Sequence, residues 1–301
     1  MNFEDITSRT KKKFFEEKHV LESSYYKSDN DLNIVTVGDL HYHEHVDKQI
    51  FKMLLCHIIE TNPDFIVIPG DLIETRGFLN SAKEKEFFED LIREMGEVAP
   101  VIMVPGNHEI ANFDTKFNRN DSNDTIKYME SLNKFKNIYF LNNESVKFDN
   151  AVFLGFNPRL EYYFKYGSDE AKEIIQEDYL KSGLRMADCN YNILLSHITP
   201  EVFQDMKKTD LVISGHWHDG YLPKKFDKFL GDTNVGLFFT PLVAPVPGIV
   251  CRGVHDFGRG YLFITQGFRK WTADIKLFNA FEKITANDVE KLTIKKSIKR
   301  I

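Results

Sequence analysis

The chain has 301 residues, of which 42% are hydrophobic and 28% charged, a composition that is typical of a globular protein and excludes a largely disordered one. Lys and Arg number 39 against 45 Asp and Glu, so the net charge of −6 provides no overall attraction for nucleic acid or for an anionic membrane. We therefore expect no stable nucleic-acid partner.

The cysteines and the lengths of the apolar runs indicate in which cellular compartment the protein is expected. The three cysteines, Cys56, Cys189 and Cys251, are scattered, without the paired spacing of a zinc ribbon or a disulfide framework. No run approaches the length of about 18 apolar residues that a membrane-spanning helix needs, and the N-terminus lacks the pattern of a signal peptide. These features favour a cytoplasmic protein without a transmembrane anchor.

Residues 1–30 are polar, with a basic cluster at residues 11–13 and an aromatic-bearing stretch at residues 14–26. This pattern predicts an N-terminal arm or a short amphipathic helix lying against the main domain. A peripheral contact with a membrane is the alternative, which interleaved glutamates disfavour. We assign residues 31–301 to one domain.

From Leu32 onward, short apolar runs alternate with helical patterns. Buried strands are predicted at residues 32–37, 65–69 and 101–104. Helices are predicted at residues 46–61 and 81–97, between these strands. The order β-α-β-α-β predicts a parallel sheet with right-handed crossovers.

The second half of the chain continues less regularly. One helix is predicted at residues 168–182. Strands are predicted at residues 137–141, 151–156, 192–195, 211–213, 260–265 and 292–294. No internal repeat or low-complexity linker divides the chain.

Five short stretches with histidine, carboxylate or asparagine side chains each follow an apolar run. They are Gly38-Asp39-Leu40-His41, Gly70-Asp71, Gly106-Asn107-His108-Glu109, Ser196-His197 and Gly215-His216-Trp217-His218. Because an α/β sheet binds its ligand at the carboxyl ends of its strands, we expect these side chains to meet at one sheet edge. Oxygen and nitrogen donors at such an edge predict a metal site.

Each stretch also has a simpler structural interpretation when it is taken alone. Asp71 is a residue type favoured at helix N-caps, His197 follows a core strand, and His216 and His218 suit a surface turn. Their shared position after strands favours the metal site. In the third stretch, Asn107 offers a neutral carbonyl oxygen to a metal, and the adjacent His108 is turned away from it and free to act as an acid.

In this order, the motifs Asp-x-His, Gly-Asp, Gly-Asn-His-Glu, His and Gly-His-x-His resemble those of the binuclear metallophosphoesterases, also called calcineurin-like phosphoesterases. The resemblance runs from Asp39 to His218. It implies an α/β fold, a four-layer αββα sandwich in which two mixed β-sheets are flanked by helices. It also implies that residues 31–301 form a metallophosphoesterase catalytic domain.

The resemblance further implies two divalent or mixed-valence metal ions, with Mn, Fe or Zn as the candidates. The ligands implied for one ion are Asp39, His41, Asp71 and His218. The ligands implied for the other ion are Asp71, Asn107, His197 and His216. Asp71 belongs to both sets and would bridge the ions.

The resemblance also implies the catalytic groups. His108 would lie beside the substrate phosphate without binding metal, and Glu74, three positions after Asp71, would orient it. We expect a water that bridges the two ions to be acidified towards hydroxide and to attack phosphorus. His108 would stabilise the phosphoryl oxygens or protonate the leaving group.

Four residues next to the motifs are predicted to bind substrate. Arg76 is a candidate phosphate contact, His43 would line the entrance, and Tyr42 and Trp217 would stack on a nucleoside or sugar. Packing inside the protein is the alternative for the two aromatic side chains.

The end of the chain is similar to a bacterial phosphodiesterase branch that includes enzymes cleaving the pyrophosphate of UDP-diacylglucosamine. Trp217 and Asp219 stand where that branch has a small residue and a glycine. We therefore predict hydrolysis of a phosphodiester or pyrophosphate bond in a phosphate-ester small molecule or lipid head group. The alternatives are a phosphomonoesterase or protein phosphatase, and a non-catalytic metal-binding scaffold.

Overall fold

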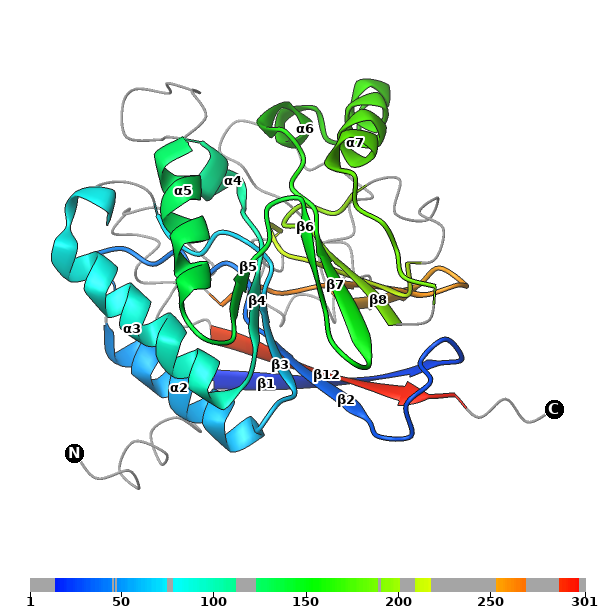
Figure 1. Cartoon of the computed structure of the whole chain (residues 1–301), viewed down its shortest axis with the longest axis horizontal. Helices are drawn as coiled ribbons and strands as arrows, with labels where there is room; N and C mark the ends of the chain where they lie inside the picture. The colour runs from blue at the N-terminus through cyan, green and yellow to red at the C-terminus, as the bar shows by residue number, and fades with distance from the viewer. Residues whose placement is uncertain are drawn as a thin grey trace, which may run out of the picture.

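The fold is built on two β-sheets with helices on the outer face of each (Figure 1). The computed structural model describes residues 14–44, 46, 48–74, 78–111, 123–188, 191–200, 209–217, 253–268 and 287–297. In this part of the chain, each sheet contains six strands and combines parallel with antiparallel pairs. Both sheets are therefore mixed, as predicted.

The first sheet has the strand order β1-β12-β2-β3-β4-β5. Its strands are β1 Phe14–Ser23, β2 Leu32–Thr36, β3 Phe65–Ile68, β4 Val101–Met103, β5 Ile138–Phe140 and β12 Asn287–Lys296. Strands β2 to β5 are parallel to one another, whereas β12 runs antiparallel to β2 and parallel to β1. The parallel strands are short apolar runs because both of their faces are covered.

The second sheet has the strand order β10-β11-β9-β8-β7-β6. Its strands are β6 Glu144–Lys147, β7 Ala151–Gly155, β8 Tyr191–Leu195, β9 Leu211–Ser214, β10 Gly253–Asp256 and β11 Tyr261–Ile264. The four central strands are parallel, and the two edge strands β6 and β10 are antiparallel to their neighbours.

The helices are α2 Lys48–Thr61, α3 Ala82–Val98, α4 Asn107–Ile110, α5 Asn123–Ser131, α6 Leu160–Lys165 and α7 Asp169–Ser182. Helices α2, α3 and α5 pack on the outer face of the first sheet and α6 and α7 on that of the second, whereas the short α4 follows the end of β4. Single 3₁₀ turns occur at Phe78–Asn80 and Leu132–Lys134. A serine begins each of the long helices α3 and α7 by accepting a hydrogen bond from the backbone N–H three residues later. None of the helices described here is long and apolar enough to cross a membrane.

Three apolar clusters hold these layers together. Adjacent residues of one strand point into different clusters, so that Ile34 of β2 lies between the two sheets and Val35 lies under α2 and α3. In β8, Ile193 faces the first sheet and Leu194 faces α6 and α7. The order of layers is therefore helices, first sheet, second sheet, helices, which confirms the predicted αββα sandwich.

The N-terminal segment differs from its prediction. Residues 14–23, expected to be an arm or helix, form strand β1, paired in parallel with β12 along its whole length. Lys18, Val20 and Glu22 are exposed while the residues between them are more buried, which is the two-residue period of an edge strand. A helix is thus wrong for residues 14–23. The proposed division at residue 30 stays a prediction.

Two other strands, β6 and β10, were not predicted from the sequence. Both are short edge strands whose residues are mostly exposed or half-buried. An apolar run marks a strand only where the strand is buried, so these two segments carried no such signal. The predicted turn between residues 141 and 151 contains β6.

Replacing Leu292 by Ala tests the placement of β12 in the first sheet, with the Leu292 side chain directed towards the second sheet. Leu292 is fully buried in the cluster between them, so its truncation should lower the free energy of unfolding by about 2–5 kcal/mol. Leu180 on α7 is 80% exposed, and Leu180→Ala should change that free energy by less than about 0.5 kcal/mol. Urea denaturation followed by circular dichroism measures both. Equal losses in the two variants would contradict the placement of β12.

Candidate metal centre

Four predicted ligands sit in backbone conformations that residues other than glycine rarely adopt. Asp39, His41, Asp71 and His216 have φ angles of 54°, 41°, 50° and 73°. The remaining non-glycine residues with positive φ in the described ranges are asparagines, which tolerate this region best. Such strain costs about 1–3 kcal/mol per residue and persists at functional sites. The surrounding structure therefore holds these four side chains in place against a local preference.

Backbone contacts and glycines bring the loops together. Beyond the ends of β2 and β3, His41 N–H donates to the Asp71 carbonyl at 2.9 Å, which continues the parallel pairing into the loops. A Cβ atom on Gly70 would lie 2.5 Å from the His197 ring, and one on Gly106 would lie 2.2 Å from the Asp71 carboxylate. Both positions therefore require glycine.

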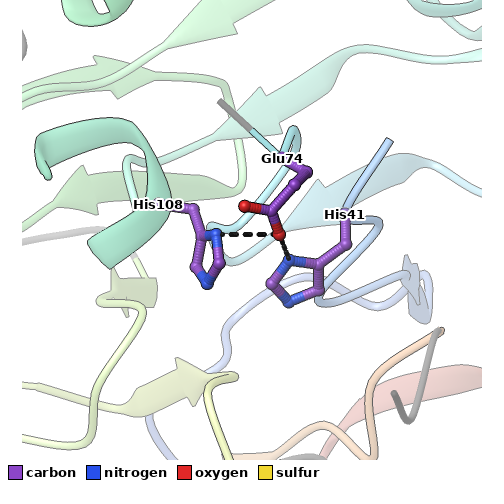
Figure 2. Close-up of side chains that lie close together, drawn as sticks. All are labelled: His41, Glu74 and His108. Carbon is purple, nitrogen blue, oxygen red and sulfur yellow. Dashed lines mark ion pairs between the residues drawn. The ribbon is translucent and has the colours of Figure 1, made fainter. Parts of the chain in front are cut away.

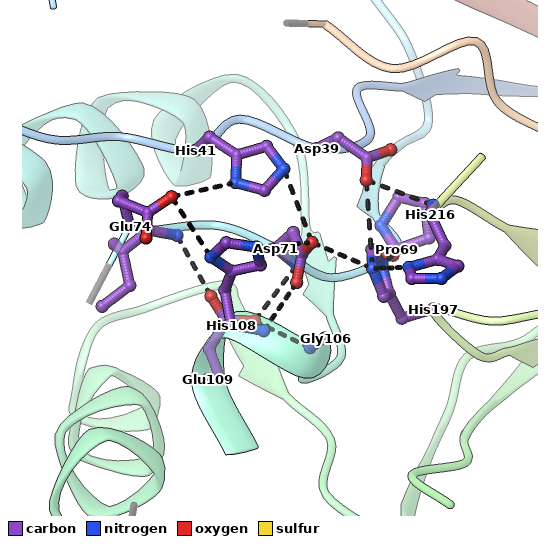
Figure 3. Close-up of polar contacts among 11 residues, drawn as sticks. Asp39, His41, Pro69, Asp71, Glu74, Gly106, His108, Glu109, His197 and His216 are labelled. Carbon is purple, nitrogen blue, oxygen red and sulfur yellow. Dashed lines mark hydrogen bonds and ion pairs between the residues drawn. The ribbon is translucent and has the colours of Figure 1, made fainter. Parts of the chain in front are cut away.

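The Asp71 carboxylate lies in the middle of the predicted residues (Figure 3). Its Oδ2 atom lies 3.1 Å from His197 Nε2, 3.4 Å from His41 Nε2 and 3.9 Å from His108 Nε2. Its Oδ1 atom accepts a hydrogen bond of 3.0 Å from the backbone N–H of His108. Asp71 is only 2% exposed, so the carboxylate meets these groups away from bulk water.

On one side of Asp71, several electron-pair donors converge. His197 Nδ1 donates to the Pro69 carbonyl at 2.7 Å, which leaves Nε2 as an acceptor in the neutral ring. That Nε2 atom faces Asp71 and also lies 3.3 Å from His216 Nδ1. Asp39 accepts a hydrogen bond from the backbone N–H of His216 at 3.1 Å and lies 3.9 Å from His197 Nε2. Acceptors this close are stabilised together by a cation or by protons.

The pKa values show how strongly the group favours positive charge. Burial lowers the pKa of His197, but the charge and hydrogen bond of Asp71 raise it to about 9. Burial likewise lowers the pKa of His108, while the charge of Asp71 and the hydrogen bond to Glu74 raise it to about 9. Burial raises the pKa of Asp71, but the charges of His197, His108 and His41 bring it well below its usual value.

Three members of each of the two predicted ligand sets come together around Asp71. Asp39, His41 and Asp71 form one group, and Asp71, His197 and His216 form another, with the candidate ligand atoms of each group within 4.8 Å of one another. Asp71 is common to both groups. His218 lies outside the described residues.

Asn107 provides a separate test of whether a cation fits. Its Oδ1 atom is buried and has no hydrogen-bond partner within the described ranges. A buried acceptor without a partner is unfavourable unless another group satisfies it, and a metal ion does so. The donors are carboxylate and amide oxygens and imidazole nitrogens, which suit Mn, Fe or Zn. The residues present therefore fit two divalent metal ions.

His108 and Glu74 form a pair beside this group (Figure 2). Glu74 Oε2 lies 3.2 Å from His108 Nδ1 and 3.9 Å from His41 Nδ1. The rings of His108 and His41 meet edge to face, with centroids 4.6 Å apart. The side chains of His108 and Glu74 are 17% and 14% exposed, so this pair is open to solvent while Asp71 is not.

Glu109 is a site residue that the sequence analysis did not single out. Its buried carboxylate accepts hydrogen bonds from the backbone N–H groups of Asp71 at 3.0 Å, Ile73 at 3.1 Å and Gly106 at 2.7 Å (Figure 3). Burial and the charge of Asp71 raise the pKa of Glu109 to about 7. Glu109 thus joins the loops that follow β3 and β4. Its place in the Gly-Asn-His-Glu stretch was the only signal available from the sequence.

Tyr163 of α6 also reaches the site without having been predicted. Its ring centroid lies 5.3 Å from that of His216 and 6.1 Å from that of His197. Burial raises the pKa of Tyr163 well above its usual value, and the charges of Asp71, Glu109 and Asp39 raise it further. The ring of Tyr163 therefore lies beside two predicted ligands, with negative charge nearby that disfavours ionisation of its hydroxyl.

Of the four predicted substrate contacts, Tyr42 is the one that the structure contradicts. Tyr42 is fully buried, its ring packs among phenylalanines including Phe51 and Phe87, and its hydroxyl donates to Glu84. A stacking contact between Tyr42 and a substrate is therefore wrong, because no face of the ring is accessible. Lys48 pairs with the same Glu84 carboxylate at 3.0 Å.

The other three candidates stay predictions. Trp217 is half-buried and packs beside Tyr166 and His216, with ring centroids 5.0 Å away in each case. His43 is half-buried in the loop after His41. Arg76 lies outside the described residues.

Comparison with known proteins gives one family. The sequence model of the calcineurin-like phosphoesterases matches residues 32–220, more than half of the chain. An uncharacterized metallophosphoesterase of Campylobacter jejuni is 23% identical over 259 residues, which cover 85% of this chain and 59% of the relative. One of Bacillus subtilis is 21% identical over 256 residues, which cover 83% of this chain and 77% of the relative. The chain thus spans less than two thirds of the Campylobacter protein.

Among solved structures, a phosphopantetheinyl hydrolase of Mycobacterium tuberculosis aligns with a TM-score of 0.44 and 10% identity. The alignment covers 81% of this chain and 93% of that chain. At this distance, details of that site do not transfer.

Replacing Glu109 by Gln tests whether its carboxylate organises the loops. The amide keeps one acceptor but turns an NH₂ group towards backbone donors, so the free energy of unfolding should fall by about 2–3 kcal/mol. Manganese affinity should fall about 10-fold to 100-fold, because groups that support ligands affect metal binding by this much. Denaturation and metal titration measure the two effects. Glu94→Gln on the exposed face of α3 is the matched control, and an equal result for both variants would rule out this role.

Proposed function

Because the chain belongs to the calcineurin-like phosphoesterase family, we propose that it is a metal-dependent phosphoester hydrolase with its active centre around Asp71. The observation that carries the proposal is the sharing of the Asp71 carboxylate between two potential ligand groups, with the His108–Glu74 pair directly beside it. A buried carboxylate among three histidines suits the binding of cations, and a half-open histidine next to it suits proton transfer to a bound phosphate.

The proposed ligands follow the two groups around Asp71. Asp39, His41 and Asp71 would hold one ion, together with His218. Asp71, Asn107, His197 and His216 would hold the other, with Mn, Fe or Zn as the candidate metals. When bound, two divalent ions neutralise charge on the phosphate and make a water molecule more acidic.

His108 and Glu74 are proposed as the catalytic pair. His108 Nδ1 donates to Glu74 Oε2, and this contact orients the ring so that Nε2 is the atom on the Asp71 side. From that position Nε2 would donate to a phosphoryl oxygen or to the oxygen of the leaving group. The pKa of His108, raised to about 9, supports a protonated ring near neutral pH in the metal-free protein.

The substrate is proposed to be a phosphodiester or a pyrophosphate, carried by a small molecule or a lipid head group. A cavity of about 460 Å³ begins at Ile110, two residues after His108, and is also lined by Asn143, Asn157 and Arg159. Arg159 pairs with Asp178 at 2.9 Å, and the Asn143 side chain accepts a hydrogen bond from the backbone N–H of Asn157 at 3.0 Å, so these polar groups of the lining already have partners. The cavity would provide room for a substituent beyond the scissile phosphate.

Two other functions remain as alternatives to a diesterase. A phosphomonoesterase or protein phosphatase uses the same kind of centre and differs in its relative rates on monoesters and diesters. A non-catalytic scaffold would take up metal without hydrolysing either. The His108–Glu74 pair, which is proposed to bind neither ion and lies partly exposed beside Asp71, supports a working centre over a scaffold.

Activity on bis(p-nitrophenyl) phosphate, measured with bound metal, tests the proposal. His108→Ala should lower kcat by about 100-fold to 10,000-fold with metal content unchanged, because it removes a proton donor and no ligand. Asp71→Asn should lose both metal and activity, since the amide carries no charge to share. His255→Ala in β10 is the matched control and should behave as the unmodified protein.

The proposal is wrong if metal-loaded protein hydrolyses neither bis(p-nitrophenyl) phosphate nor p-nitrophenyl phosphate. Preference for the monoester would support the phosphomonoesterase. Full activity of Asp71→Asn would show that the Asp71 carboxylate is not needed for hydrolysis.

A further inference from the structure

Two consecutive tyrosines of α6 point in different directions. Tyr162 is fully buried in the cluster under the second sheet, where its hydroxyl donates to the Thr199 carbonyl at 3.0 Å. Tyr163, the next residue, turns its ring towards the metal centre and lies edge to face with His216 at 73°. Successive residues of a helix point about 100° apart, so one of the pair packs inside while the other faces the site.

Two sets of contacts fix the position of helix α6, one from Arg159 before the helix and one from Tyr162 within it. The backbone N–H of Arg159, just before the helix, donates to Asp178 of α7 at 2.8 Å, and Arg159 Nε donates to the same carboxylate at 2.9 Å. The Tyr162 hydroxyl ties the helix to Thr199, two residues after His197. The position of Tyr163 is thus set by contacts to α7 and to the loop that carries His197.

The hydroxyl of Tyr163 is buried but has no hydrogen-bond partner in the part of the chain that the structure describes. Tyrosines whose whole side chains are buried have one: Tyr26 donates to the Asn30 carbonyl at 2.9 Å, and Tyr191 donates to the Asp210 carbonyl at 3.3 Å. The hydroxyl of the half-buried Tyr128 on α5 also lacks a hydrogen-bond partner among the described residues, and its charged neighbour is Glu89. A buried hydroxyl without a partner destabilises the fold compared with a phenylalanine of the same shape. A purely structural role therefore does not account for the hydroxyl of Tyr163.

We propose that Tyr163 is a substrate-contacting residue whose hydroxyl donates a hydrogen bond to an oxygen of the phosphate bound at the candidate metal centre. This inference rests on the proposed function. The ring of Tyr163 lies beside the rings of His197 and His216, and its hydroxyl is buried, so a phosphate between the proposed ions would bring an oxygen within its reach. His108 approaches the same centre from the opposite side of Asp71 (Figure 3). The two donors would hold the phosphate from two directions.

Calorimetric titration of inorganic phosphate into the manganese-loaded protein tests this inference with the variant Tyr163→Phe. A hydrogen bond to an anion is strong, so the Kd for phosphate should rise about 10-fold or more. Manganese content should stay the same. The Tm of the metal-free variant should equal or exceed that of the unmodified protein, because an unpartnered buried hydroxyl has been removed.

Tyr179→Phe is the matched control, since it makes the same change on α7 in a ring that packs on Phe156 away from the metal centre. It should leave phosphate affinity unchanged. Unchanged phosphate affinity in Tyr163→Phe would overturn the inference while leaving the proposed function intact. A loss of manganese from Tyr163→Phe would mean that the hydroxyl supports metal binding. A lower Tm of that variant would mean that the hydroxyl stabilises the fold. Either result overturns the inference. If the unmodified protein neither binds manganese nor hydrolyses phosphoesters, the proposed function and the inference both fail.

Discussion

The buried carboxylate of Asp71 is the interaction on which the rest of this site depends. It lies within 3.9 Å of nitrogen atoms from His41, His108 and His197, side chains that come from loops after three different strands. Two backbone hydrogen bonds to Glu109, from the N–H groups of Asp71 and Ile73, hold the loop that carries it. The Asp71 and Glu109 carboxylates are both buried and repel each other, which is unfavourable unless positive charge lies nearby. In the metal-free protein, histidines with raised pKa values provide that charge, and in the metal-loaded protein the proposed pair of cations would provide it.

The αββα sandwich provides the rigidity that this arrangement needs. Apolar clusters on both sides of each sheet fix the strands, so the loops at their carboxyl ends start from defined positions. The loops then adopt left-handed backbone conformations at four predicted ligands. Polar atoms of Asn107 in α4 and Tyr163 in α6 are buried without hydrogen-bond partners among the residues that the structure describes. Each of these features lowers stability locally. Their concentration around Asp71 is typical of a functional site, where stability is given up for geometry.

Part of this account was accessible from the sequence. Apolar runs located the central parallel strands, and the polar residues directly after them located the site, because in a parallel sheet the chain itself dictates which ends meet. Strand β1 was missed because an edge strand alternates polar and apolar residues weakly. Glu109, Tyr163 and the true position of Tyr42 were missed for a different reason: their roles depend on which atoms approach in space, and neither spacing nor residue type carries that information.

A crystal structure of the manganese-loaded protein with anomalous diffraction data tests most directly whether the Asp71 carboxylate organises the metal centre. We predict two anomalous peaks, one on each side of the Asp71 carboxylate, with one carboxylate oxygen or both shared between them. Asp39 and His41 should contact the first ion, and His197 and His216 the second. A single ion, or ions bound away from Asp71, would contradict the claim that this carboxylate organises the centre.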